Sequence, residues 1–165
     1  ADLIMVPKPD RDRNLGANTL KSALFASGRP VMMCPPREGA PEAVCQRLAI
    51  GWNGSVEASR AVALSMPLIE AADAVTILTA GEEIHGASAE DLMATLALRG
   101  VSAQVRRFSA RGNPVGRDLL REAGEAGADT LIMGAYGDSH ERETVFGGNT
   151  QVVVDHATMP VILVH

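Results

Sequence analysis

Lysine is scarce in this chain of 165 residues, where it occurs only at Lys8 and Lys21. Acidic residues outnumber basic ones by 20 to 15, and the formal net charge is -5. Nucleic-acid binding depends on lysines and arginines that displace counterions from phosphates, and the sequence contains no basic stripe. The composition therefore argues against nucleic acid as a partner.

Cysteine is equally rare. Cys34 and Cys45 do not form a Cys-x-x-Cys pair and have no neighbouring histidine, and the histidines elsewhere lack metal-binding spacing. These patterns indicate neither a metal centre nor a redox motif. No Gly-x-Ser-x-Gly turn is present for a hydrolase nucleophile either. We interpret both cysteines as reduced thiols.

Long apolar runs are also missing. A membrane helix needs about 20 apolar residues, and no segment reaches that length. Nor does a basic segment followed by an apolar one indicate a leader. We therefore expect a cytoplasmic protein without a membrane partner. Because the first residues open directly onto the strand-like run LIMV, we also expect the sequence to begin inside a domain.

From Arg47 to His165 the sequence alternates regularly between strand-like and helix-like segments. The strand-like runs lie at 48–52, 74–80, 101–108, 130–134 and 160–164. This alternation is typical of a mainly parallel sheet with helices on both faces. The prediction is one doubly wound α/β domain with a five-stranded sheet over residues 47–165.

The intervening segments carry apolar residues at helical spacing. The first helix is expected within 56–72. Ser88 is expected to cap the second helix and Gly100 to end it, while Pro114 is expected at the first position of the third. The last helix is expected over about 149–156.

Residues 1–36 repeat the end of this domain. The matching segments are ADLIM at 1–5 with ADTLIM at 128–133, GANT at 16–19 with GGNT at 147–150, and RPVMM at 29–33 with MPVIL at 159–163. Three matches in the same order indicate an internal repeat. We interpret residues 1–36 as a strand–helix–strand remnant of an upstream domain, and residues 37–46 as a linker.

A glycine-rich loop follows the strand at 130–134. Gly134, Gly137, Gly147 and Gly148 flank a charged segment of nine residues, 138–146. In an open α/β sheet, ligands bind outside the carboxyl ends of the strands. Glycines there let backbone N–H groups surround an anion, and the N-terminus of the next helix adds unpaired donors. The loop therefore favours phosphate, although its spacing differs from the P-loop and dinucleotide motifs.

The domain resembles the universal stress protein family over its whole length. LAIGWNGS is similar to the family's opening strand with its Asp-Gly-Ser, GNPVGRDLLREAGEAGADTLIMGAYG to the third-helix and fourth-strand block, and HATMPVILVH to the closing strand. The series Gly134, Gly137 and Gly147 has the spacing of the family's nucleotide loop. Residues 1–36 resemble the tail of a first, degenerate copy, as in a tandem protein of two such domains.

The resemblance implies an adenine nucleotide alpha hydrolase-like fold with strand order 3-2-1-4-5. It also implies ATP or AMP, with or without Mg²⁺, across the carboxyl ends of the first and fourth strands. The residues that would meet the nucleotide are Gly51, Trp52 and Asn53 after the first strand, Ala80 through its backbone, and Met133, Gly134, Gly137, Gly147, Gly148, Asn149 and Thr150 around the loop. The resemblance implies no catalytic residue and no metal ligand.

Two positions depart from the family's ATP-binding pattern. Asn53 stands where ATP-binding members place aspartate, and Gly148 where they usually place serine or threonine. Thr150 would partly replace the missing hydroxyl. The charged segment 138–146 adds Glu141 and Glu143, whose charges oppose those of a triphosphate.

The resemblance also predicts how the domain pairs. The last strand, PVILV, is an uncovered apolar edge, and such edges are association surfaces. We expect it to pair with PVMMC of residues 30–34 through a pseudo-twofold contact, and we expect a homo-oligomer. Arg106 and Arg107 are expected to mark the opposite, charged edge.

These features favour a non-catalytic, nucleotide-binding stress-response module that acts as a regulatory switch through domain pairing. One alternative is a nucleotide-free dimerisation and interaction module. Another is a slow ATPase or an autophosphorylating protein with Ser139, His140 or Thr144 as acceptor.

Overall fold

The computed structural model describes residues 2–39, 42–81, 86–109, 114–137 and 148–165. Strands and helices alternate along nearly the whole chain. The elements are β1 (Ile4–Pro7), α1 (Ala17–Ser27), β2 (Val31–Cys34), β3 (Arg47–Gly51), α2 (Val56–Leu64), α3 (Met66–Ala71), β4 (Ala74–Ala80), α4 (Ala89–Ala97), β5 (Ala103–Phe108), α5 (Val115–Glu125), β6 (Thr130–Gly134), α6 (Gly148–His156) and β7 (Val161–Val164).

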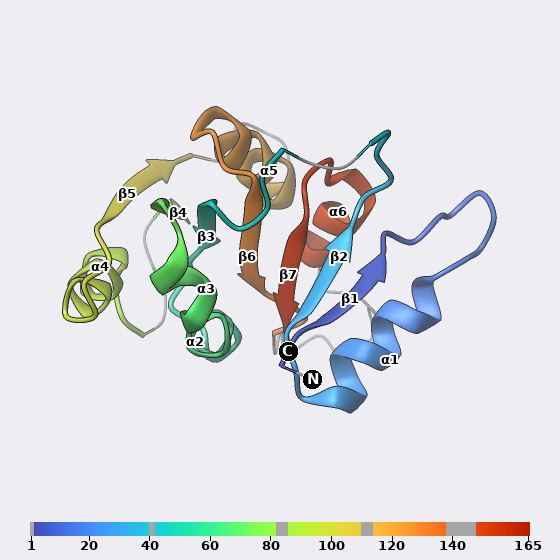
Figure 1. The fold of residues 1–165 in the computed structure, drawn as a ribbon, viewed down its shortest axis with the longest axis horizontal. Coiled ribbons are helices and arrows are strands. Elements are labelled where there is room, and N and C mark those ends of the chain that lie inside the picture. The colour runs from blue at the N-terminus through green and yellow to red at the C-terminus, as the bar shows by residue number, and fades with distance from the viewer. Residues whose placement is uncertain (1, 40–41, 82–85, 110–113, 138–147) are drawn as a thin grey trace.

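All the strands belong to one sheet of seven, in the order β1-β2-β7-β6-β3-β4-β5 (Figure 1). The strands predicted for the domain follow each other as β5-β4-β3-β6-β7, which confirms the expected order 3-2-1-4-5, and they pair in parallel. The expected count of five is wrong for the sheet, because β1 and β2 continue it beyond β7.

The N-terminal unit, residues 2–36, joins the sheet through β2. This strand pairs antiparallel with β7, and Met32 lies opposite Ile162. The predicted contact between PVMMC and PVILV is therefore present within one chain. β1 then pairs in parallel with β2. That this unit is the remnant of an upstream domain stays a prediction.

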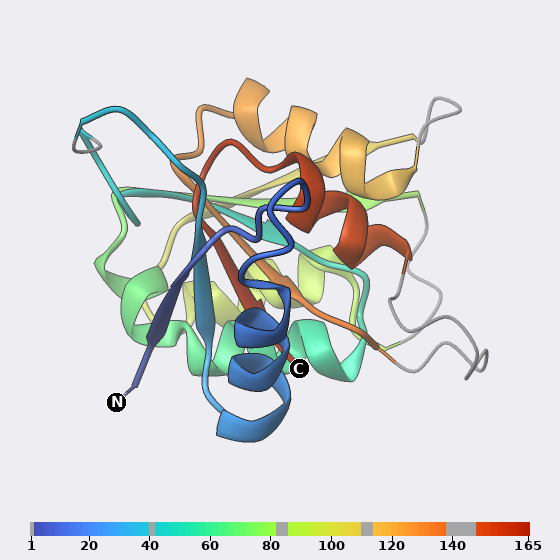
Figure 2. The ribbon, with the colours of Figure 1, turned by 90° about the vertical axis from the view of Figure 1, so that its right-hand side faces the viewer.

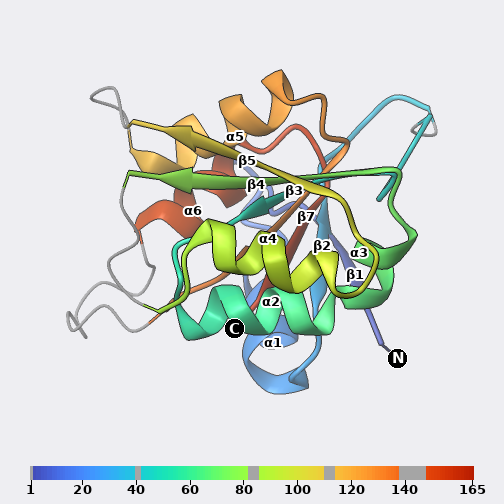
Figure 3. The ribbon, with the colours of Figure 1, turned by 90° about the vertical axis from the view of Figure 1, so that its left-hand side faces the viewer.

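The sheet separates two apolar layers. Helices α1, α5 and α6 pack on one face with Leu20, Leu119 and Val153, while α2, α3 and α4 pack on the other. Figure 3 shows α5 and α6 across the sheet from α2 and α4, and Figure 2 views the opposite end, with α1 in front. Neighbouring residues of β6 alternate between the layers, Leu131 in one and Ile132 in the other. Strands buried on both faces read as continuous apolar runs.

Three helix boundaries can be compared with those predicted from the sequence. Ser88 caps α4 as predicted, and its side chain and that of Asp91 form a capping box. The segment at 56–72 forms two helices rather than one, with Ser65 between them. Pro67 explains the break, because its ring would clash with the carbonyl four residues earlier. Pro114 occupies the N-cap of α5 rather than its first helical position.

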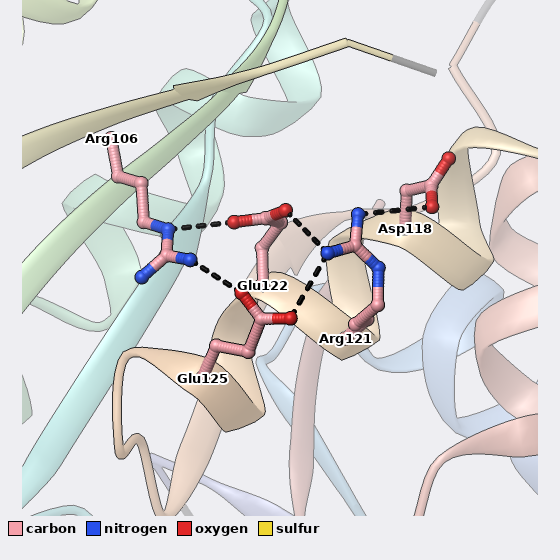
Figure 4. A network of polar contacts seen from close by, with 5 residues as sticks. All are labelled: Arg106, Asp118, Arg121, Glu122 and Glu125. Carbon is pink, nitrogen blue, oxygen red and sulfur yellow. Dashed lines mark hydrogen bonds and ion pairs between the residues drawn. The ribbon is translucent and has the colours of Figure 1, made fainter. Parts of the chain in front are cut away.

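The edge opposite β1 is β5, as its arginine pair predicted. Arg106 Nε lies 2.6 Å from Glu122 Oε2, and Arg106 Nη2 lies 2.6 Å from Glu125 Oε2. Arg121 joins Glu122 and Asp118 to the same network (Figure 4). Both Asp118 and Glu122 are buried. Buried carboxylates need charged partners, and these partners fasten α5 to the edge strand.

Helices α5 and α6 approach closely at Gly116. A Cβ atom there would lie 2.6 Å from the backbone oxygen of Asn149, whereas a Cβ at Gly124 would meet no described atom within 4 Å. Both glycines lie in α5. Alanine has a higher helix propensity than glycine, so without crowding either substitution would stabilise the helix.

We expect Gly116→Ala to lower the free energy of unfolding by about 1–3 kcal/mol, because a rigid backbone atom occupies the required space. Gly124→Ala serves as the matched control and is expected to raise the same free energy by about 0.5–1 kcal/mol. Urea unfolding followed by the fluorescence of Trp52, the single tryptophan, measures both. Equal stabilisation by the two substitutions would contradict the close contact.

Candidate functional site

A cavity of about 730 Å³ lies beyond the carboxyl ends of β3 and β6. Its size falls within the range of small-molecule sites, roughly 300–1,000 Å³. The described residues that line it are Asn53, Gly54, Ser55, Val56, Glu57, Gly86, Met133, Gly134, Tyr136, Gly137, Gly148, Asn149 and Thr150. The cavity therefore occupies the place where the sequence predicted a ligand.

Most of the predicted site residues line this cavity. Those that do are Asn53, Met133, Gly134, Gly137, Gly148, Asn149 and Thr150. Gly51, Trp52 and Ala80 are not part of the lining. Gly147 lies outside the described residues, as do Ser139, His140, Glu141, Glu143 and Thr144 of the charged segment 138–146. The roles proposed for all of them stay predictions.

Gly134 lies against the first turn of α2. A Cβ atom on this residue would be 2.6 Å from Ala58 N and 2.7 Å from the carbonyl carbon of Glu57. Gly134 and Gly137 are not among the residues with positive φ. Glycine at 134 is thus required by the close approach of a helix, and not by an unusual backbone conformation.

Two helices begin at the cavity. Ser55 caps α2, since its Oγ accepts a hydrogen bond of 3.1 Å from Ala58 N, and Asn53 Oδ1 accepts one of 3.1 Å from Ser55 N. The first turn of α6 contributes Gly148 and Asn149 to the opposite side. Each helix N-terminus carries the equivalent of about +0.5 charge. The backbone therefore gives the cavity positive potential from two directions.

The side chains of Asn149 and Thr150 have partners within the protein. Asn149 Oδ1 accepts a hydrogen bond of 3.3 Å from Gly116 N, at the start of α5. Thr150 Oγ1 accepts one of 3.2 Å from Tyr136 N. The sequence analysis expected both residues to serve phosphate. In this structure they position neighbouring backbone, and the Thr150 hydroxyl keeps its proton to donate.

Gly51 and Trp52 have packing roles. The Trp52 side chain is 5% exposed within the layer beneath α2 and α4, and its Nε1 donates a hydrogen bond of 2.9 Å to Ala87 O. A Cβ on Gly51 would lie 3.1 Å from Leu119 Cδ2, on the side of α5. Ala80 pairs with Phe108 of β5. These contacts explain by packing and pairing alone why each residue occurs at its position, without a ligand.

Sequence reasoning missed Glu57. This half-buried residue lies in the first turn of α2, and a Cβ built on Gly137 would be 2.9 Å from its Oε2. Glu57 is the one carboxylate among the described lining residues. The sequence contained a signal for this residue, because acidic residues are favoured in the first turn of a helix. The helix that follows Asn53 begins at the predicted site, and Glu57 is in its first turn.

Tyr136 was also missed. It lies between Gly134 and Gly137 with a left-handed φ of 54°, and its ring packs 5.4 Å from that of Phe25 in α1. Phe25 in turn meets His165 edge-on at 4.6 Å. Burial, together with the negative charge of Asp155, raises the pKa of Tyr136 to about 12. This aromatic contact joins the cavity wall to the N-terminal unit.

Tyr136 is the only tyrosine, so tyrosinate absorbance reports on this site alone. We expect a midpoint near pH 12 in the folded protein and near 10 in the urea-unfolded protein. The raised pKa favours the neutral phenol. Its contribution to stability is therefore complete below pH 10 and is lost as the pH rises towards 12. Trp52 fluorescence identifies the pH range in which the fold persists, and a folded-state midpoint near 10 would refute the burial.

Within the described ranges, no group of three or more His, Cys, Asp or Glu side chains is arranged to hold a metal ion. No helix in that part of the chain combines the length and apolar character needed to cross a membrane.

Solved structures share this fold. A universal stress protein from Archaeoglobus fulgidus matches with a TM-score of 0.74 at 18% identity, covering 99% of this chain and 62% of that one. The present chain thus spans about three fifths of that relative's length. A universal stress protein from Lactobacillus plantarum matches with a TM-score of 0.54 at 17% identity, covering 75% of this chain and 100% of that one. At these identities the likeness shows the fold.

The family itself is shown by sequence. Comparison with curated proteins gives no significant match. The sequence model of the universal stress protein family matches residues 46–165, which agrees with the domain predicted from residue 47 onward. The chain therefore belongs to the universal stress protein family, a family of stress-response modules.

Proposed function

We propose that the chain binds an adenine nucleotide, ATP or AMP, and acts as a non-catalytic regulatory switch through domain pairing. One observation supports this most strongly. The N-termini of α2 and α6 converge on a single cavity at the carboxyl ends of β3 and β6. Unpaired backbone N–H groups and aligned peptide dipoles at such positions bind phosphate.

The rest of the cavity suits a nucleoside. Met133, Val56 and Tyr136 give it apolar surface beside the polar first turns of the helices. Small-molecule sites commonly combine an apolar lining with a few placed polar groups. The proposal rests on helix N-termini, which would bind phosphate. They supply no side chain for proton transfer, so the proposal does not include hydrolysis.

A route exists from the cavity to the N-terminal unit. Helix α6 begins at the cavity, and near its end Lys8 Nζ donates a hydrogen bond of 3.1 Å to Ala157 O. Arg11 forms an ion pair of 2.8 Å with Asp155 in the last turn. The ring of Tyr136 adds a second route through Phe25. A ligand that orders the cavity wall would therefore also order α1 through these contacts. This supports a switch based on the pairing of the N-terminal unit with the domain.

Gly148 allows a test that spares the fold. It lines the cavity, and a Cβ there would meet no described atom within 4 Å. We expect wild-type protein, freed of bound small molecules, to bind ATP or AMP in calorimetric titration. Gly148→Leu should weaken that binding at least tenfold by filling ligand space. Gly124→Leu is the control, since it alters an equally open helical glycine away from the cavity.

A second candidate function is a nucleotide-free interaction module. It is favoured by the side chains of Asn53, Asn149 and Thr150, whose oxygen atoms already accept hydrogen bonds within the protein. Absence of heat with wild-type protein, together with no nucleotide released on denaturation, would reject nucleotide binding and leave this function. Equal affinity of wild type and Gly148→Leu would place the ligand elsewhere.

The proposed switch through domain pairing leads to a separate prediction. Saturating nucleotide should slow amide hydrogen exchange in α1, because Tyr136 of the cavity wall packs on Phe25. Phe25→Ala should reduce this protection and leave nucleotide affinity within about twofold of wild type. Leu15→Ala, which alters another exposed apolar residue of the N-terminal unit, is the control. Nucleotide binding without any change in α1 would overturn the proposed route.

A further inference from the structure

Glu57 is the feature of the cavity that a phosphate-binding role does not explain. Glu57 is half-buried at the N-terminus of a helix, and its carboxylate lies beside Gly137. Within the described part of the chain, Glu57 forms no ion pair and no side-chain hydrogen bond. None of the described lining residues is a lysine or arginine. Among these described lining residues, the positive potential thus comes from backbone, and the one full charge is negative.

This arrangement has opposite effects on ligands of different charge. A carboxylate a few ångströms from a phosphate opposes it by Coulomb repulsion, which grows with every added phosphate charge. The helix N-termini attract the same phosphates, but each supplies only about half a charge. A ligand with few charges gains from the dipoles at small cost. A metal-free triphosphate meets the full repulsion.

Magnesium reverses the sign of this interaction. Mg²⁺ is usually held by one or two carboxylates together with the phosphates of a substrate, and it keeps several of its waters. A single carboxylate beside a helix N-terminus that would hold phosphate matches that pattern. With the ion between them, Glu57 and a triphosphate attract the same cation instead of repelling each other.

We propose that Glu57 selects the ligand of this site by charge, favouring AMP over metal-free ATP and admitting ATP together with Mg²⁺. The inference rests on the proposed nucleotide-binding function and names its ligand class more closely. Glu57 acts here as a specificity-determining residue. No chemical step is implied.

The test compares affinities for AMP and ATP, with and without Mg²⁺, in wild type and Glu57→Gln. Glutamine keeps the size of the side chain and removes its charge. Without Mg²⁺, wild type should bind AMP at least fivefold more tightly than ATP, and Glu57→Gln should reduce this preference to less than twofold. Mg²⁺ should tighten ATP binding at least fivefold in wild type, and little in Glu57→Gln.

Two further variants act as controls. Glu57→Asp keeps the charge and should retain the Mg²⁺ effect. Glu90→Gln removes an acid from the first turn of α4, where Glu90 pairs with Arg107 outside the cavity lining, and should behave as wild type. Thermal unfolding should show that all three variants remain folded.

The outcomes separate the two claims. If neither wild type nor Glu57→Gln binds AMP or ATP under any condition, the proposed function fails. If both proteins bind with the same preference and the same response to Mg²⁺, nucleotide binding stands and the role of Glu57 is refuted.

Discussion

The close approach of β6 to the first turn of α2 is the constraint on which the site depends. At Gly134 the space for a Cβ atom is already taken by the backbone of Glu57 and Ala58, 2.6–2.7 Å away. Backbone atoms cannot yield as a flexible side chain can, so a larger residue at this position would displace the start of α2. The cap at Ser55, the turn at Asn53 and the carboxylate of Glu57 all belong to that start. Gly134 therefore lets the start of α2 lie close to the end of β6, where both line the cavity.

The sequence predicted what local signals control. The apolar runs of β4 and β6 and the helix cap at Ser88 lie where they were expected, since each depends on residues within a few positions of one another. Burial of Asp118 and Glu122 was not predicted, because the partner that makes it tolerable, Arg106, is on another element. The extension of the sheet by β1 and β2 likewise depends on long-range pairing. A pattern with a helical or strand period contains no information about such partners.

The candidate site shows the same division. Its glycines were predicted from their position after a strand, where they were expected to contact a nucleotide. The structure shows instead that Gly134 contacts α2, a helix distant in sequence. The interactions of Asn149 and Thr150 with Gly116 and Tyr136 were equally hidden, because they depend on how α5, α6 and the loop pack. Side-chain type predicts which hydrogen bonds a residue is able to make. Only the fold decides which of them it makes.

Helix α6 joins the chemistry of the cavity to the N-terminal unit. Its N-terminus lines the cavity, where its dipole favours an anion. At its other end the dipole is negative and Asp155 adds to that charge, so cations are needed there. Lys8 and Arg11 supply them, both from the loop that follows β1. The N-terminal unit thus stabilises the same helix that gives the cavity much of its positive potential. Under the proposed function, a change in the position of that unit would therefore alter α6, and with it the anion bound at the start of that helix.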